Sequence, residues 1–449
     1  MNKSRKLLVI GAGIGGLTAA ALLPQQGWQV TVLEAGTYPG GCAATFSHKG
    51  YRFEAGATLA GGFDPAGPHS RVAEILGLTW PVTPITNAAW VTHLAGMSIH
   101  QWVEPARWRD EYLTKFPFSA RFWQKQEQLA KIAWELSARG FPWPPATLSE
   151  AARLPLALRP QALTAAPYLF RKMRQLLPRE TTPQFKAFVD GNLLISAQAV
   201  SDRADALYGA SVLDLPRRGV MRVQGGMGAI AETLVAWIKA NGGEVKYRQR
   251  VTRLETAHGR VRAALTAKEM RFEADVFLAN LTPWALENLL GEAAPRRLRS
   301  ENFSRPEMWG AFVVHAAFGK EKIMPAITHH QVIVDVNQPL GEGNSVFISF
   351  LPEEKTAILS THVRARLEKP GCSGIRRQKS RPGREGADRR RKRLPRLARR
   401  RPPDTDRLAA HLRVLHPPSF GHGWRLPADF ALWRARSADW FWQPVAGGR

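Results

Sequence analysis

The sequence is poor in cysteine and in acidic side chains. Its 449 residues include 2 cysteines, and 37 Asp and Glu stand against 63 Lys and Arg, a formal net charge of +26. So few cysteines exclude a disulfide framework and a cysteine-based metal cluster. The sequence also has no H-E-x-x-H, C-x-x-C or P-loop pattern, which excludes the chemistry that depends on each.

The excess of positive charge is concentrated at one end of the chain. Residues 361–449 hold 23 Lys and Arg against 7 Asp and Glu. A charge of +26 by itself would favour nucleic acid as a partner, but residues 1–360 have the mildly basic composition of an ordinary enzyme. We therefore expect no specific nucleic-acid partner. With 44% hydrophobic residues, the chain is predicted to be globular, with two or three domains.

A glycine-rich turn follows the first apolar run. We predict a buried strand over residues 6–10, a helix over 15–26 that stops at Gly27, and a second strand over 29–33 that ends at Glu34. A signal peptide or a buried glycine-rich helix would not explain this acidic residue. The order and length are those of a Rossmann βαβ unit, which binds a dinucleotide.

Each glycine of this turn has a predicted role. Gly11 allows a sharp turn off the strand, Gly13 lets the backbone approach a pyrophosphate, and Gly16 lets the helix pack closely. The helix N-terminus offers free N–H groups to the phosphates. Glu34 is placed to accept hydrogen bonds from a ribose diol, and its charge disfavours a 2′-phosphate, so NADP is not expected here.

The residues after Glu34 separate FAD from NAD. A glycine-rich loop with the sequence PGG at 39–41 and FEAGAT at 53–58 follows, where a simple NAD domain would repeat a helix and a strand. A second block runs from RVQGGMGAI at 222–230, through the Gly-Gly turn at 242–243 and Val251, to FEADVFLAN at 272–280.

These two blocks resemble the flavoprotein family of bacterial-type phytoene desaturases and carotenoid isomerases, whose superfamily includes the amine oxidases. The resemblance covers residues 5–363. Stretches at 57–63, 76–82, 213–219 and 339–347 are most similar to the carotenoid 3′,4′-desaturases. Two positions depart from the pattern, since Cys42 replaces an arginine and Glu54 an aspartate that many members carry.

The resemblance implies FAD as cofactor and an α/β fold. A Rossmann-like FAD-binding domain of the amine-oxidase and phytoene-desaturase type would be interrupted by a mixed α+β substrate domain. The implied cofactor-binding residues are Gly11, Gly13, Gly15, Gly16, Glu34, Ala35, Gly40, Gly41, Cys42, Gly56, Ala57, Thr58 and Val251. Cys42 is interpreted as a small packed residue, with a redox thiol as the alternative. The paired glycines at 225–226 would open a helix near the flavin.

The domain boundaries follow from the same blocks. Residues 1–68 and 215–281 are assigned to the FAD-binding domain, 69–214 and 282–363 to the substrate domain, and 364–449 to an arginine-rich tail. Within the substrate domain we predict a helix that Ser119 caps and Gly140 stops, with a core-facing stripe. Trp80, Trp90, Trp102 and Trp108 could line a polyene tunnel or pack in the core. His329 and His330 are adjacent and cannot both bind one metal ion from a strand, and no metal site is expected.

Residues 151–179 contain six basic side chains, many apolar ones and no acid. This pattern suits an anionic membrane surface as well as a solvated face over a core helix. Pro155, Pro160 and Pro167 break the stretch into pieces too short to span a bilayer. We expect a peripheral protein on the cytoplasmic side of a bacterial membrane, which takes a lipid-soluble carotenoid from the bilayer. The sequence does not indicate an oligomeric state.

By resemblance the reaction is desaturation of a carotenoid at C-3′,4′, with a hydride passed to the flavin and a proton released. No catalytic acid or base can be named. The alternatives are a cis–trans isomerase that uses reduced flavin, an amine-oxidase-like flavoenzyme, or an inactive member of the family.

The last alternative rests on the tail. Family members end with a Gly-Asp motif, and this sequence contains no Gly-Asp pair. From Arg364 onward there are 20 Arg and 3 Lys without hydrophobic periodicity. We interpret this as a frameshift near residue 364 and expect the tail to be disordered. The alternative is a genuine basic tail that binds nucleic acid or anionic lipid.

Overall fold

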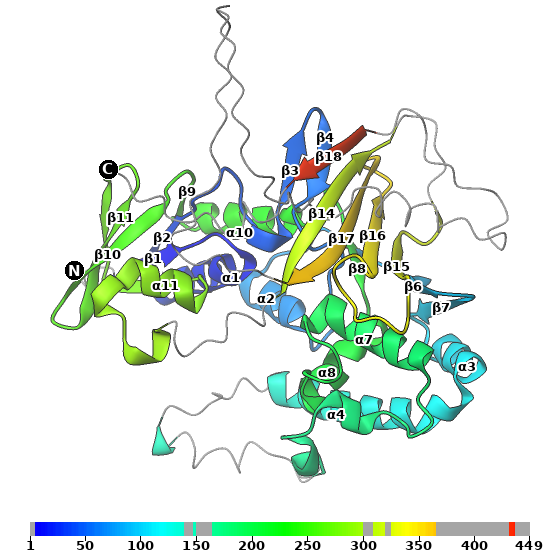
Figure 1. Ribbon diagram of the computed structural model, residues 1–449. Coiled ribbons are helices and arrows are strands. Elements are labelled where there is room, and N and C mark those ends of the chain that lie inside the picture. The colour runs from blue at the N-terminus through cyan, green and yellow to red at the C-terminus, as the bar shows by residue number, and fades with distance from the viewer. Residues whose placement is uncertain are drawn as a thin grey trace, which may run out of the picture.

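The computed structural model describes residues 5–138, 147–149, 164–299, 309–318, 325–364 and 431–435. One of the two halves of the folded molecule is built on a parallel sheet with the strand order β13-β1-β2-β9 (Figure 1). The strands are β1 (Arg5–Ile10), β2 (Trp28–Leu33), β9 (Glu244–Lys246) and β13 (Val276–Ala279). β1 lies between β2 and β13, and its last four residues are buried on both faces, as the apolar run predicts.

Two layers cover this sheet. On one face lie α1 (Ile14–Leu22) and α10 (Gly228–Ala240), which bury Leu17, Leu234 and Ile238 against it. The other face packs on a three-stranded antiparallel sheet and on α11 (Pro283–Leu290). That sheet consists of β10 (Val251–Ala257), β11 (Arg260–Thr266) and β12 (Arg271–Glu273). The Rossmann-like α/β fold is therefore confirmed.

Helix α1 is shorter than predicted. It ends at Leu22, because Pro24 begins a separate 3-10 turn over Pro24–Gln26. Proline has no N–H to continue the helical hydrogen bonds. Gly27 ends this turn with φ +79°, as the predicted stop requires.

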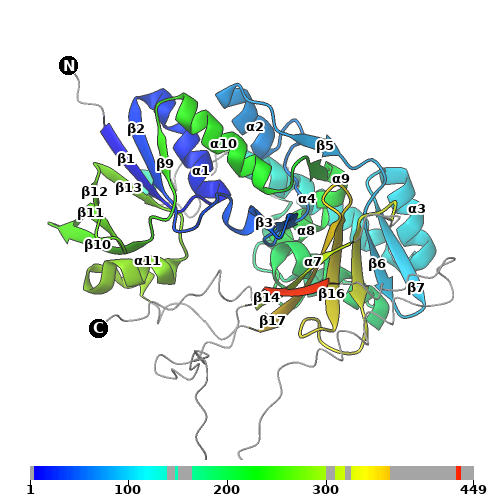
Figure 2. The same ribbon diagram turned by 90° about the horizontal axis from the view of Figure 1, so that it is seen from above.

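The other half of the folded molecule contains a mixed sheet in the order β18-β14-β17-β16-β15-β6-β7 (Figure 2). Only the β15–β6 pair is parallel. The strands are β6 (Ala88–Leu94), β7 (Met97–Trp102), β14 (Trp309–Ala317), β15 (His329–Ile333), β16 (Ser345–Leu351), β17 (Thr356–Arg364) and β18 (Ala431–Ala435). This sheet is thus assembled from segments far apart in the sequence.

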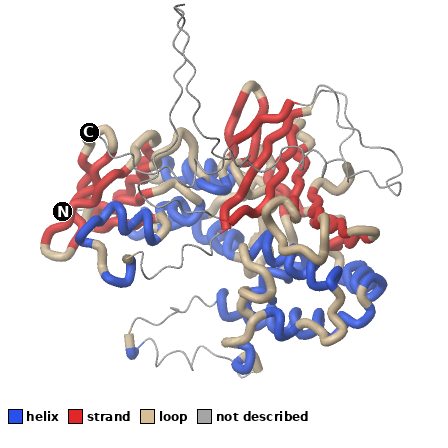
Figure 3. Tube along the Cα trace, viewed as in Figure 1, coloured by secondary structure: helices blue, strands red, loops and turns tan. Residues whose placement is uncertain are grey.

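Helices lie against one side of this sheet (Figure 3). They are α3 (Pro105–Lys115), α4 (Ala120–Ala138), α7 (Pro183–Ala197), α8 (Ala206–Leu213) and α9 (Leu215–Arg218). Their shared core is aromatic, with Phe116, Phe122, Trp123, Phe185 and Phe188 all buried. The predicted stripe of α4 is buried: Phe122 packs in this aromatic core, and Leu129 and Ile132 pack in a neighbouring cluster with Ala210 of α8.

The remaining elements connect the two halves. β3 (Thr45–His48) and β4 (Tyr51–Glu54) form a hairpin, and β5 (Val82–Pro84) pairs with β8 (Met221–Val223). Helix α2 (Pro68–Leu76) buries Leu76 in the core of α1 and α10. The predicted boundary at residue 68 therefore falls at the start of a helix that packs with the cofactor domain. Similarly, α11 lies beyond the boundary at 281 yet packs on β10.

Several local predictions need correction. Ser119 precedes α4, but its hydroxyl donates to the Phe116 carbonyl instead of capping the helix; Gly140 lies outside the described residues. Trp80, Trp90 and Trp108 pack in the cores, and Trp102 lies under the Arg107 guanidinium, so the polyene-tunnel interpretation finds no support.

Five residues of the tail, Ala431–Ala435, form β18 on the edge of β14. For these five the expectation of disorder is corrected, because an exposed edge strand offers unpaired backbone groups to an extended segment. The other tail residues, 365–430 and 436–449, lie outside the described residues. Among those described, no helix combines the length and apolarity needed to cross a bilayer.

Candidate dinucleotide-binding site

The glycine turn joins β1 to α1 at the carboxyl edge of the parallel sheet. Gly11 has φ +97°, and its N–H donates to the Leu33 carbonyl at 2.8 Å. A Cβ on Gly16 would stand 2.4 Å from the Gly11 carbonyl oxygen, so the close packing predicted for Gly16 is present. The first turn of α1 carries no acidic residue and no side-chain cap, which leaves its N–H groups available to an anion.

Glu34 lies beside this turn, as predicted. Its carboxylate accepts the N–H of Ala12 at 2.8 Å and the N–H of Gly36 at 2.6 Å. These bonds hold the side chain between the glycine turn and the loop that starts at Ala35. Each oxygen keeps a further lone pair that a ribose hydroxyl could donate to.

The loop after Glu34 returns to the turn. The N–H of Gly40 donates to the Ala12 carbonyl at 2.8 Å, and Gly40 bridges to Gly13. A Cβ on Gly41 would stand 3.4 Å from the Gly13 Cα. The loop is continuous with the second predicted segment, since the N–H of Ala57 donates to the Cys42 carbonyl and Gly56 packs on the same oxygen. The predicted glycines thus meet in one place.

Cys42 differs from its interpretation as a packed residue. It is exposed, because it sits on the outer side of a 3-10 turn over Gly41–Ala43. Desolvation by its surroundings nevertheless raises the pKa of the thiol. A raised pKa reduces the fraction of thiolate, the reactive form, so this shift does not support the alternative of a redox thiol.

Val251 begins β10 close to Glu34. The N–H of Gln249 donates to the Glu34 carbonyl at 2.7 Å. Two tyrosines that the sequence did not single out approach the same carboxylate. Burial and the Glu34 charge raise the pKa of Tyr38 to about 12, and burial with the charges of Glu34 and Glu232 raises the pKa of Tyr247. Tyr38 and Tyr247 therefore stay neutral phenols at the predicted ribose end of the site.

Asn280 is the residue that sequence reasoning missed here. It follows β13, and its N–H donates to the Ile10 carbonyl at 2.9 Å. A Cβ on Gly13 would stand 2.8 Å from its Nδ2 atom, and one on Gly15 3.2 Å from its Oδ1. A Cβ on Gly13 would therefore collide with the Asn280 amide, so the glycine leaves room for this side chain at the turn.

Glu54 explains the paired glycines at 225–226. Its carboxyl is buried and accepts the Met227 N–H at 2.9 Å and the Thr45 hydroxyl at 2.7 Å. Gly226 has φ +87°, and a Cβ there would stand 2.6 Å from the Glu54 Oε1. Burial, the dominant cause, raises the pKa of Glu54 to about 7. Its backbone carbonyl accepts the His315 Nε2–H at 2.9 Å, so this residue ties both cofactor segments to β14.

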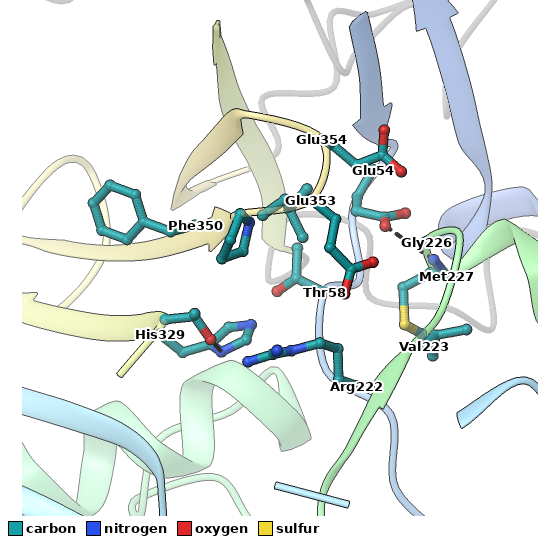
Figure 4. A pocket seen from close by; sticks show the side chains of 13 residues that line it. Glu54, Thr58, Arg222, Val223, Gly226, Met227, His329, Phe350, Glu353 and Glu354 are labelled. Carbon is teal, nitrogen blue, oxygen red and sulfur yellow. Dashed lines mark hydrogen bonds between the residues drawn. The ribbon is translucent and has the colours of Figure 1, made fainter. Parts of the chain in front are cut away.

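Thr58, another of the predicted cofactor-binding residues, lies where the two halves of the molecule meet. Its hydroxyl is 2.7 Å from that of Ser349 on β16. Figure 4 shows it in a small cavity with Met227, His329 and Arg222, next to the Glu54–Met227 hydrogen bond. This cavity is partly open to solvent and has a volume of about 40 Å³, room for one or two waters.

His329 and His330 lie on opposite sides of β15. His329 lines the cavity, and burial lowers its pKa to about 3. His330 Nδ1 is instead 3.1 Å from His93 Nε2, while its Nε2 donates to the Ile327 carbonyl. Burial also lowers the pKa of His330, so both imidazoles of β15 are neutral near pH 7.

Comparison with known proteins agrees with this geometry. The NAD(P)-binding Rossmann-like domain family matches residues 9–76. The chloroplastic prolycopene isomerase of Arabidopsis thaliana is 26% identical over 360 residues, covering 76% of this chain and 59% of the relative. The lycopene-forming phytoene desaturase of Paracoccus sp. is 26% identical over 352 residues, covering 74% and 65%. The chain is a homologue of prolycopene isomerases and phytoene desaturases.

The alignment of this chain with these enzymes does not extend over their whole length. The chain spans about six tenths of the length of the prolycopene isomerases. Among solved structures, cyclohexylamine oxidase from Brevibacterium oxydans IH-35A superposes with a TM-score of 0.54 at 17% identity, covering 98% of this chain and 86% of that one. This likeness shows the shared fold.

The site of this homologue fits a dinucleotide. It offers free helix N–H groups for a pyrophosphate, a carboxylate with spare lone pairs for a ribose, and glycines that let a ligand approach.

Proposed function

We propose that the chain binds FAD and desaturates a carotenoid, with the C-3′,4′ bond as the position of reaction. The arrangement of Glu34 and Gly40 around the Gly11–Gly16 turn carries the proposal, together with the homology to carotenoid enzymes. Bound FAD would supply the acceptor for the two electrons that desaturation removes. The chain's own residues would hold the pyrophosphate and the ribose and exclude water at the Thr58 junction.

Replacing Gly13 with valine is expected to abolish FAD retention. The new side chain would displace the Asn280 amide, 2.8 Å from the Cβ position, and occupy the approach of the pyrophosphate. The measurement is the absorbance near 450 nm of the purified chain, for which the wild type should show a bound flavin. Gly61→Ala, where a Cβ would meet only Leu215 at 3.6 Å, serves as the control. A full flavin spectrum in Gly13→Val would contradict the proposed site.

Isomerisation is the second candidate, because the prolycopene isomerases match more of this chain than the desaturase does. Product absorbance separates the two. Desaturation adds a conjugated double bond and moves the spectrum to longer wavelength, whereas isomerisation keeps their number. The third candidate, an amine oxidase, would release hydrogen peroxide from amines; it is supported by a likeness in fold alone.

We further propose that the protein sits peripherally on the cytoplasmic face of a bacterial membrane. In the described part of the 151–179 stretch, Phe170 is 94% exposed and Leu169 51%. The positive charge of this stretch is weaker than the sequence indicated, because folding pairs Lys172 with Asp205 and Arg174 with Asp202. The membrane contact would therefore depend mainly on the two apolar side chains. Residues 150–163 lie outside the described residues.

Phe170→Ser is accordingly expected to reduce co-sedimentation with phosphatidylglycerol-containing vesicles by about tenfold, the effect of losing one inserted aromatic side chain. Met270→Ser removes an exposed apolar side chain from the β11–β12 turn and should change nothing. Equal binding of both variants would contradict the assigned surface.

The tail after residue 364 bears on whether this chain is an inactive member of the family. We propose a frameshift near codon 364, supported by the loss of resemblance and of hydrophobic periodicity after β17. Translation of the other two frames beyond that codon should reveal a Gly-Asp motif followed by Pro-Gly. Its absence from both frames would favour a genuine basic tail.

A further inference from the structure

Asn280 lies beside the glycine turn between β1 and α1. Its backbone is fixed by the end of β13, where its N–H donates to Ile10, the last residue of β1. From there it meets every glycine of the turn. A Cβ added to Gly11 would stand 2.9 Å from the Asn280 carbonyl oxygen, and one added to Gly16 would stand 3.0 Å from the Asn280 Cβ. A Cβ on Gly13 would stand 2.8 Å from Nδ2 of the same side chain, and one on Gly15 3.2 Å from its Oδ1.

The orientation of the amide suits an anion. Nδ2, the donor, lies beside Gly13, the N-cap of α1, where the unsatisfied N–H groups of the helix begin. No described residue provides a hydrogen-bond partner for the side-chain amide, although Asn280 is only partly exposed. A polar group in this position adds one more donor to those that the helix already directs at a phosphate.

We propose that Asn280 is a ligand of the dinucleotide, and that its Nδ2 donates a hydrogen bond to the pyrophosphate held at the Gly11–Gly16 turn. The inference rests on the proposed function only in that it requires a bound dinucleotide. It is independent of which polyene reacts. The alternative role is a brace, in which the side chain supports the turn by its shape and makes no contact with the ligand.

Two substitutions separate these roles. Asn280→Asp keeps the shape but replaces the donor with a negative charge, and Asn280→Ala removes both shape and donor. A ligand role predicts that Asp weakens FAD binding more than Ala does, by at least about tenfold relative to wild type, because a charge-assisted hydrogen bond is lost and repulsion is added. A brace predicts the reverse order, with Asp close to wild type.

The experiment is FAD titration of the full chain after removal of flavin, followed by quenching of flavin fluorescence, with the melting temperature of each variant measured alongside. Asn241→Asp at the exposed end of α10 adds the same charge away from the site and should bind FAD as the wild type does. Asp binding equal to wild type, or tighter than Ala, would overturn the proposal. A wild type that binds FAD but converts no polyene would overturn the proposed function alone.

Discussion

Gly16→Ala is expected to destabilise the chain by about 2–3 kcal/mol, as overpacking against rigid neighbours does. The added Cβ would stand 2.4 Å from the Gly11 carbonyl oxygen and 3.0 Å from the Asn280 Cβ. Neither can move independently, because Gly11 is hydrogen-bonded to Leu33 and Asn280 to Ile10. The helix must therefore move away from β1, which also displaces the N–H groups that face the dinucleotide.

The measurement is urea denaturation of the variant beside Gly61→Ala, in which the new Cβ makes an ordinary 3.6 Å contact with Leu215. The midpoint should fall for Gly16→Ala and stay near wild type for the control. FAD affinity should fall with it, even under conditions where the variant is folded. Unchanged stability and unchanged affinity would show that the turn can relax.

The second large effect concerns pH. Burial raises the pKa of Glu54 from 4.5 to about 7 in the folded chain. A group whose pKa is raised by folding stabilises the protein fully below its unfolded pKa, and this stability is lost as pH rises through the folded value. Over pH 4.5 to 7 the loss amounts to roughly 3 kcal/mol.

Glu54→Gln removes this titration and keeps acceptor and donor groups for Met227 and Thr45. Relative to wild type, the variant should therefore gain roughly 3 kcal/mol of stability between pH 4.5 and pH 8. Comparing the two chains cancels the histidines, such as His93 and His362, whose burial lowers the pKa to about 4 and which act in the opposite direction. The exposed Glu74→Gln serves as control. Parallel curves for wild type and Glu54→Gln would contradict the raised pKa.

The cofactor half of the fold could be predicted because its signals are local. The strand, turn and helix around Gly11–Gly16 follow one another directly, and Glu34 ends the next strand. Periodicity and turn chemistry specify such units without knowledge of the rest of the chain.

What failed depends on contacts between distant segments. Nothing near Asn280 in the sequence indicates that β13 pairs with β1, so its place over the turn could not be foreseen. Glu54 looked like a minor substitution for aspartate, but its carboxyl reaches Met227. The basic stretch around residue 172 looked unpaired because its acidic partners, Asp202 and Asp205, lie some thirty residues further on.

The position of β13 also governs how the chain can form during synthesis. β1 is made first, but one of its two neighbours in the sheet spans residues 276–279. At about 5–20 residues per second, the ribosome needs on the order of 13–55 seconds to reach that strand. Until then one edge of β1, whose last four residues are buried in the finished fold, lacks its partner. The phosphate turn gains its Asn280 neighbour only at the end of this interval, so a chain released earlier would have its glycines but not the finished site.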